Sequence, residues 1–173
     1  PPANKWVHLC VTYNGKRNAN AVEIYMDGTK QEKIIAANTL KANTIKTDKP
    51  FRIGRRFNSA QVNGTEIDEV RVYNRTLSLE EIKVIMFLQY QSIPEPSGLT
   101  AGLNFDAFDG NKTKDIASPG RVFVLHGGAN QTDLGKSSNG FKIEKNGFLE
   151  STQIGKLEHN QPFSWSVWIK TPK

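Results

Sequence analysis

The chain has 173 residues, 37% of them hydrophobic and 9% aromatic, and no apolar run approaches the roughly 20 residues of a membrane-spanning helix. This composition favours one folded domain with a core of its own and excludes a disordered chain. The formal net charge is +6, but the basic residues are scattered, so the charge does not indicate nucleic-acid binding. The single Cys10 excludes an internal disulfide and a CxxC metal site.

The N-terminal half predicts a series of short strands. Residues 6–13 (WVHLCVTY) alternate, with apolar residues on both faces, as in a central strand. Residues 21–26 and 29–35 are predicted to form a hairpin about Asp27-Gly28, a strong two-residue turn signal. Residues 50–55 predict a further strand with a glycine inside it, where a bulge or a close backbone approach is expected.

The stretch 64–82 (GTEIDEVRVYNRTLSLEEI) predicts a strand, a turn and the start of a helix. Ser78 stands three residues before Glu81 and ahead of an apolar run, which is the spacing of a capping box. The helix is expected to run from about residue 79 to residue 89. In the strand, period two places one apolar pair on each face: Val70 with Val72, and Ile67 with Tyr73.

A linker is predicted at residues 92–101 (SIPEPSGLTA), and the C-terminal half that follows again predicts short strands. The predicted strands are residues 102–105, 122–126, 140–144 and 148–151, the last two joined by an Asn146-Gly147 turn. In residues 163–170 (FSWSVWIK), Trp165 and Val167 are expected inward with Phe163 and Ile169, and Trp168 on the other face. Strands about every ten residues, with one helix, indicate an all-β antiparallel sandwich of two sheets.

The motifs WVHLCVTYNG, EIYMDG and FRIGRR, followed by the stretch 64–82, together resemble the C-terminal half of a laminin-G-like domain. These domains are concanavalin A-like jelly rolls of the lectin–glucanase family. The family pattern is a Trp-led strand with a Tyr-Asn-Gly turn, a Tyr-x-Asp-Gly hairpin, an Ile-Gly strand, and an Ile-Asp-Glu-Val strand that runs into a short helix. The resemblance covers roughly half of the chain as an ordered set of motifs. It implies a jelly-roll sandwich.

The C-terminal half resembles the beginning of such a domain, through LNFDAFDG, a Gly-Phe-x-Ile strand and FSWSVWIK. The usual order is therefore inverted, and the strands that normally follow Trp-Ile-Lys and precede Trp-Val-His are absent. A natural permutation, a fragment of two tandem domains, and a sandwich that lacks a few strands are three competing explanations. We favour one compact domain over 1–173, built from residues 1–91 and 102–173, because each half alone would expose an apolar sheet face. The absent strands leave a groove or an open sheet edge, through which two copies could pair as a homodimer.

The resemblance is to laminin-G-like modules of large secreted or envelope proteins of bacteria, and it implies a secreted or cell-envelope setting. The leading hypothesis is a non-catalytic carbohydrate-binding module of a secreted multidomain protein. The alternative is a structural or protein-interaction spacer without a sugar ligand. The expected partner is accordingly a glycan or an extracellular protein. A glucanase-like glycoside hydrolase is a weaker third hypothesis.

Sugar binding needs an aromatic face for stacking and polar groups for the hydroxyls. Trp168 is out of phase with the inward residues of its strand, so a sheet covered on one side would expose it. In a sheet covered on both sides, it would instead pack in the core, for example against Trp6. The candidate ligand-binding residues are Tyr25, Arg55, Arg56, Asn58, Tyr73 and Trp168.

Jelly-roll relatives often hold a calcium ion, which takes several carboxylate and carbonyl oxygens. The resemblance therefore makes calcium a candidate cofactor. Three aspartates lie in one loop and a fourth could join them, and the candidate ligands are Asp68, Asp106, Asp109 and Asp115. The alternative interpretation is that Asp and Gly are simply favoured in loops.

Catalysis is not expected. A glycosidase needs two carboxylates that flank the sugar. Glu66 and Asp68 share a strand face, but the usual Glu-x-Asp-x-x-Glu spacing is missing, and the resemblance gives Asp68 a hydrogen-bonding role at the strand start. The three histidines lie far apart in the sequence and form no grouping with a nucleophile.

Overall fold

The computed structural model describes residues 1–40, 43, 45–46, 49–56, 60–88, 94–152, 154 and 157–173. The all-β class with one short helix is confirmed. The helix, α1, spans Leu79–Ile85, and a 3₁₀ turn, η1, spans Ala19–Ala21. The strands are β1 (Trp6–Tyr13), β2 (Val22–Met26), β3 (Thr29–Lys30), β4 (Phe51–Ile53), β5 (Arg55–Arg56), β6 (Ala60–Gln61), β7 (Thr65–Tyr73), β8 (Leu99–Leu103), β9 (Phe108–Asp109), β10 (Lys112–Lys114), β11 (Val122–Thr132), β12 (Gly140–Ser151) and β13 (Phe163–Lys170).

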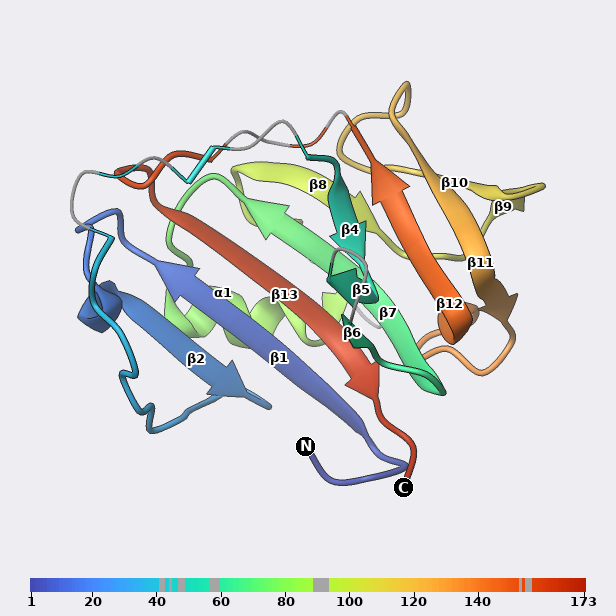
Figure 1. The fold of residues 1–173 in the computed structure, drawn as a ribbon, viewed down its shortest axis with the longest axis horizontal. Helices are drawn as coiled ribbons and strands as arrows, with labels where there is room; N and C mark the ends of the chain where they lie inside the picture. Colours follow the sequence, from blue (N-terminus) through green and yellow to red (C-terminus); the bar gives the residue numbers. More distant parts are fainter. Residues whose placement is uncertain are drawn as a thin grey trace.

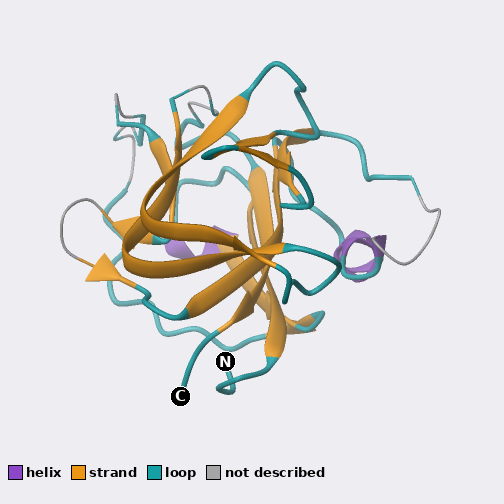
Figure 2. Ribbon diagram, turned by 90° about the vertical axis from the view of Figure 1, so that its right-hand side faces the viewer, coloured by secondary structure: helices purple, strands orange, loops and turns teal. Residues whose placement is uncertain are grey.

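Eleven strands form one sheet in the order β3-β2-β1-β13-β7-β12-β11-β10-β9, with β4 beside β12 and β8 beside β7. The sheet branches, because β7 shares one edge between β12 and β8, and β12 shares one edge between β7 and β4. It thus divides into a first layer, β3-β2-β1-β13-β7-β8, and a second layer, β9-β10-β11-β12-β4. Figure 2 shows the strands curving around the interior. The two layers of the predicted sandwich are therefore hydrogen-bonded to each other through β7 and β12 rather than forming separate sheets.

The core between the layers takes its side chains from both halves of the sequence. β1 of the N-terminal half pairs with β13 of the C-terminal half from Trp6↔Lys170 to Tyr13↔Phe163, and the two chain ends lie close together (Figure 1). The interpretation of residues 1–173 as one domain stays a prediction. The core consists of aliphatic and aromatic side chains: Ile67, Val70, Leu103, Phe105, Phe123, Ala129, Phe141, Ile143 and Leu149.

A bulge in β7 changes which of its side chains face this core. The register with β13 shifts between Ser166 and Trp168, and Glu69 opposite this step has a φ of +53°. The extra residue lets Ile67 face the core together with Val70, although period two alone places them on opposite faces. The predicted pairing of Ile67 with Tyr73 on one face is therefore wrong.

The first layer has two faces that are covered very differently. Its core face, which carries Leu9 and Val11 of β1, looks toward the second layer. Its helix face lies against α1, which runs behind β1 and β13 in Figure 1. On the helix face, Cys10 and Tyr73 pack with three side chains of the turn and helix, Leu77, Ile82 and Ile85.

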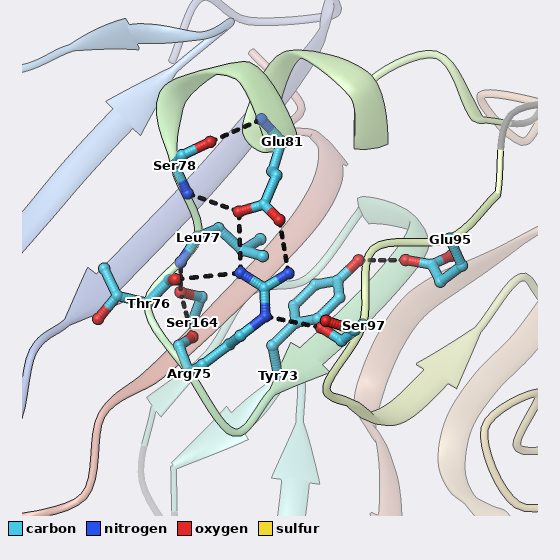
Figure 3. A network of polar contacts seen from close by, with 9 residues as sticks. All are labelled: Tyr73, Arg75, Thr76, Leu77, Ser78, Glu81, Glu95, Ser97 and Ser164. Carbon is cyan, nitrogen blue, oxygen red and sulfur yellow. Dashed lines mark hydrogen bonds and ion pairs between the residues drawn. The ribbon is translucent and has the colours of Figure 1, made fainter.

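The corner between β7 and α1 is held by polar contacts, drawn in Figure 3. Ser78 and Glu81 form the predicted capping box, with Ser78 Oγ accepting from the Glu81 amide. Arg75 donates two hydrogen bonds to the Glu81 carboxylate, at 2.6 and 2.8 Å. Ser164 of β13 accepts from the Leu77 amide and donates to the Arg75 carbonyl, so the corner is attached to the sheet. The helix ends at Ile85, before the predicted residue 89.

Two connections differ from the predictions. The hairpin after Asp27-Gly28 is short, because β3 ends at Lys30 rather than at residue 35. The predicted linker 92–101 is partly structured, since residues 99–101 belong to β8 and Glu95 accepts hydrogen bonds from Tyr73 and Arg71. Residues 92 and 93 lie outside the described residues.

β11 and β12 form one long antiparallel pair instead of the three shorter segments, 122–126, 140–144 and 148–151, that the sequence predicts. Its register shifts between His126 and Gly128, so the residues 145–147 bulge out where a turn was expected. A Cβ on Gly128 would lie 2.4 Å from the Glu144 carbonyl oxygen, so this close approach requires glycine. Pairing then resumes at His126↔Phe148.

Candidate functional site

The surface of the second layer carries a groove of about 320 Å³, which we call the outer groove. It is lined by alternate residues of β11, Val122, Val124 and His126, and by Glu150 and Thr152 at the end of β12. These side chains point outward because their strand neighbours, such as Phe123 and Leu149, occupy the core. The strand alternation therefore positions the groove over the core on a paired, regular part of the sheet.

An aromatic pair adjoins the outer groove. His126 and Phe148 are direct cross-strand partners, and their rings are stacked with centroids 4.6 Å apart and planes 12° apart. Both residues are half-buried, so part of the pair faces solvent. The guanidinium carbons of Arg52 and Arg55 lie 5.0 and 5.5 Å from the centroid of the Phe148 ring. This arrangement combines an aromatic surface with cationic hydrogen-bond donors.

The polar groups of the outer groove are already ordered. Arg52 Nε lies 2.6 Å from Glu150 Oε2, and the two residues are register partners on β4 and β12. Arg55 Nε is buried, and within the described parts of the chain it has no hydrogen-bond partner. The site therefore offers a carboxylate, two guanidinium groups and an imidazole around an aromatic pair, which are the groups that sugar hydroxyls and ring faces use.

Of the predicted ligand-binding residues, Arg55 lies at this site and Arg56 is exposed beside it on β5. Tyr25, on β2, is half-buried and donates to Glu23, and burial raises its pKa to about 12. Tyr73 is completely buried and donates to Glu95. Asn58 lies outside the described residues.

The exposure that a one-sided sheet predicts for Trp168 is wrong. Trp168 is only 6% exposed, because the helix face on which it lies is covered. It packs edge-on against His8, with ring centroids 5.3 Å apart, and Lys136 Nζ lies 4.5 Å from its ring centroid. Trp165, which was expected inward, does lie on the core face but is 37% exposed.

The helix face also contains buried polar groups with shifted pKa values. Burial, together with the charge of Arg71, lowers the pKa of His8 to about 3. Burial raises the pKa of Cys10 to about 12. Burial and the nearby Glu69 raise the pKa of Asp68 to about 7, against the lowering effect of the backbone N–H groups that it accepts. These groups are enclosed, so they are poorly suited to receive a sugar.

The four aspartates proposed for calcium serve as hydrogen-bond acceptors or stay apart. Asp68 accepts from the amides of residues 69, 136 and 137. Asp115 is buried and accepts from Arg121 and from two backbone amides. Asp106 accepts from Asn104, and Asp109 is exposed at β9. Among the described residues no group of three or more His, Cys, Asp or Glu side chains could hold a metal, so calcium binding stays a prediction without a ligand set.

Sequence reasoning missed most of the outer groove. The signal was present in the alternation of Val122, Val124 and His126 against the core residues of the same strand. The pairing of His126 with Phe148 depends on the bulge between them and could not be read from either segment alone.

A family model matches residues 1–83, the Laminin_G_3 model of the concanavalin A-like lectin/glucanases superfamily. Residues 1–83 are therefore similar to this superfamily. The matched range contains the strands from β1 to β7 and the beginning of α1, which are the elements that carry the motif resemblance. Residues 84–173 lie outside it, so the inverted order of the laminin-G-like halves stays a prediction. No curated protein and no solved structure matched the chain.

Laminin-G-like, concanavalin A-like domains are in general carbohydrate-binding or interaction modules, generally non-catalytic and commonly extracellular. The described part of this chain contains no helix long and apolar enough to span a membrane. Glu66 and Asp68, the carboxylates considered for glycoside hydrolysis, are engaged with Lys170 and with backbone amides respectively. Neither carboxylate lines the outer groove, so this pair offers no support for the glucanase hypothesis.

Proposed function

We propose that the protein is a non-catalytic carbohydrate-recognition module of a secreted multidomain protein, and that it binds sugar in the outer groove. The observation that carries this proposal is the stacked His126–Phe148 pair beside a groove lined by Glu150. Sugar rings present flat C–H faces that pack on aromatic rings, while their hydroxyls need donors and acceptors at the rim. The similarity of residues 1–83 to the superfamily supports the same class of function.

The groove is partly open to solvent, which suits part of a polysaccharide chain better than an enclosed small molecule. Its polar atoms come from side chains on neighbouring strands, so their spacing is fixed by the sheet and needs little ordering on binding. The ion pair of Arg52 with Glu150 holds both groups in place beside the aromatic pair. Binding in the outer groove requires no movement of the core.

A glycan array with and without calcium, followed by calorimetry with the best ligand, tests the proposal. We expect Phe148→Ala to weaken binding by about fivefold or more, if a sugar face gains from this ring a stacking energy in the range of about 1–3 kcal/mol that a nucleic-acid base gains from an aromatic side chain. Arg55→Gln should weaken binding less. Phe87→Ala is the matched control, because Phe87 is an exposed phenylalanine that follows α1, away from the groove.

Unchanged affinity in folded Phe148→Ala would remove the outer groove as the site. A chain that binds no sugar on the array would leave the second candidate, a protein-interaction spacer. That candidate is favoured by a separate observation, since part of the core face of the first layer is not covered by the second layer.

A further inference from the structure

A second groove, of about 400 Å³, opens between β4 and the core face of the first layer, and we call it the apolar groove. Its walls are Phe51 and Ile53 of β4 and its floor is formed by β13 and β7. The floor residues of β13 are Phe163, Trp165, Val167 and Ile169, and none of them is fully buried. Trp165 is 37% exposed, an unusual state for a tryptophan that faces a protein interior.

The apolar floor continues beyond the groove onto β1 and β2. Val11 is the register partner of Trp165 on one side and of Ile24 on the other, so the three side chains share a face. Leu9 continues the same row between Val167 and Met26. The described second layer ends at β4, so among the described residues no strand covers the outer strands of the first layer on this face. A continuous apolar sheet face of this kind marks an interaction surface.

β4 adds an open backbone edge to this apolar floor. It pairs with β12 along one edge, and among the described residues its other edge has no strand partner. An apolar floor beside an unpaired strand edge can receive an additional strand, which gains backbone hydrogen bonds from the edge and places alternate side chains on the floor. The surface therefore fits an extended segment rather than a helix or a flat domain surface.

The chain itself presents such a segment. After β3, residues 31–35 are assigned to no strand or helix, and Ile34 is 97% exposed with Ile35 next to it at 42%. The segment does not continue as a strand along the edge of β2. Gln31 N–H still donates to the Ile24 carbonyl, but the Val22 carbonyl further along this edge accepts from the side chain of Lys33, through Nζ. Ile34 is thus held beyond the edge of β2 with nearly all of it exposed, and Ile35 beside it is partly exposed.

We propose that the apolar groove of one copy binds the segment 33–37 of a second copy, with the segment added beside β4 and Ile34 seated over Trp165. The chain carries both the groove and the segment, so a two-fold pair makes the contact twice and closes on itself. The predicted homodimer would then form through a groove on the core face and not through the edge of β2. At that edge, Lys33 places a charged side chain and occupies the Val22 carbonyl. The proposal does not rest on sugar binding, although Arg52, which lines the apolar groove, is also paired with Glu150 of the outer groove.

Sedimentation equilibrium over a range of protein concentrations tests this pairing. We expect the wild-type chain to approach twice its 19.3 kDa mass, and Ile34→Asp and Trp165→Asp each to weaken pairing by more than about tenfold. Leu134→Asp is the matched control, since Leu134 is an aliphatic residue that is 61% exposed on a distant loop, and it should pair as the wild type does. Thermal unfolding of each variant, compared with the wild type, distinguishes a loss of pairing from a loss of folding.

Mixing two defective copies separates this contact from any other. A copy with Ile34→Lys keeps a normal groove, and a copy with Trp165→Asp keeps a normal segment. Neither should pair alone, but their mixture retains one intact contact and sets the new lysine beside the new aspartate, so a mixed pair should form. A wild-type chain that stays monomeric, or an Ile34→Asp chain that pairs normally, would overturn the proposal. So would a mixture that shows no mixed pair.

Discussion

The two faces of the first layer are built from the same strands but have opposite properties. On β13, Trp168 points to the helix face and is buried, while Trp165, three residues earlier, points to the core face and is partly exposed. The helix face is closed by α1 and by the segment of residues 136–137, whose amides bind Asp68. The core face is closed only where the second layer reaches it. The elements that pack over each face, and not the residue pattern of the strand, therefore decide which tryptophan is buried.

The largest effect should come from exchanging the two tryptophans for alanine. Trp168→Ala removes a fully packed ring and should lower the free energy of unfolding by about 3–5 kcal/mol. Trp165→Ala, on the same strand, should lower it less, because 37% of the residue is already solvated. Urea unfolding of dilute protein measures both. Equal losses would show that the two faces are covered to the same extent.

The buried groups of the helix face should give the next largest effect through pH. The unfolded chain protonates His8 near its ordinary pKa of 6.5, but the folded chain does so only near 3, so this group lowers stability as the pH falls from 6.5. Asp68 acts in the opposite direction, because the folded chain binds its proton near pH 7 and the unfolded chain only near 3.8. Stability gained from Asp68 protonation therefore rises as the pH falls from 7 toward 4.

Between about pH 4.5 and 6 the two contributions oppose each other. On acidification, the free energy of unfolding of His8→Phe should rise relative to that of the wild type by up to about 1.4 kcal/mol per pH unit. That of Asp68→Asn should fall relative to the wild type by a similar amount. Chemical unfolding at three pH values in this range measures the slopes. Slopes that match the wild type for both variants would mean that neither group is enclosed as the structure shows.

The smallest of the three effects should come from the cap of α1, the helix that closes the helix face. Ser78→Ala removes the acceptor for the Glu81 amide and should cost about 1 kcal/mol. Ser118→Ala is the control, at a half-buried serine whose hydroxyl makes no described hydrogen bond. Its free energy of unfolding should stay within about 0.5 kcal/mol of the wild-type value. Thermal unfolding compares them, and a neutral Ser78→Ala would mean that the corner is held by the Arg75–Glu81 contacts instead.

Features that depend on near neighbours in the sequence could be predicted. The spacing of Ser78 and Glu81 and the Asp27-Gly28 turn each have a local cause and occur in the structure. The alternation of residues 163–170 also occurs, and Trp165 lies on the core face as predicted, but Trp165 is partly exposed and the exposure that a one-sided sheet predicts for Trp168 is wrong. Which face is closed depends on α1 and on residues 136–137, which are remote in sequence, so the pattern of one strand could not reveal it.

The candidate site shows the same limit. Arg55 was predicted as a polar group for sugar hydroxyls, but the aromatic surface that it joins is made by His126 and Phe148, from strands whose register is set by a bulge. A sequence pattern gives the phase of each strand separately. The number of residues that the bulge absorbs, here residues 145–147 opposite a single glycine, decides which side chains meet across the pair.

The position of Cys10 gives the closed side of the sheet a built-in chemical reporter. Its thiol is fully enclosed beneath α1 and stays protonated at neutral pH, so an alkylating reagent can modify it only in molecules whose helix has lifted away. As the single cysteine of the chain, it makes the rate of alkylation a direct count of such opening events. Iodide quenching of Trp165 fluorescence would report on the core face, because this side chain is partly exposed without any lifting of the helix.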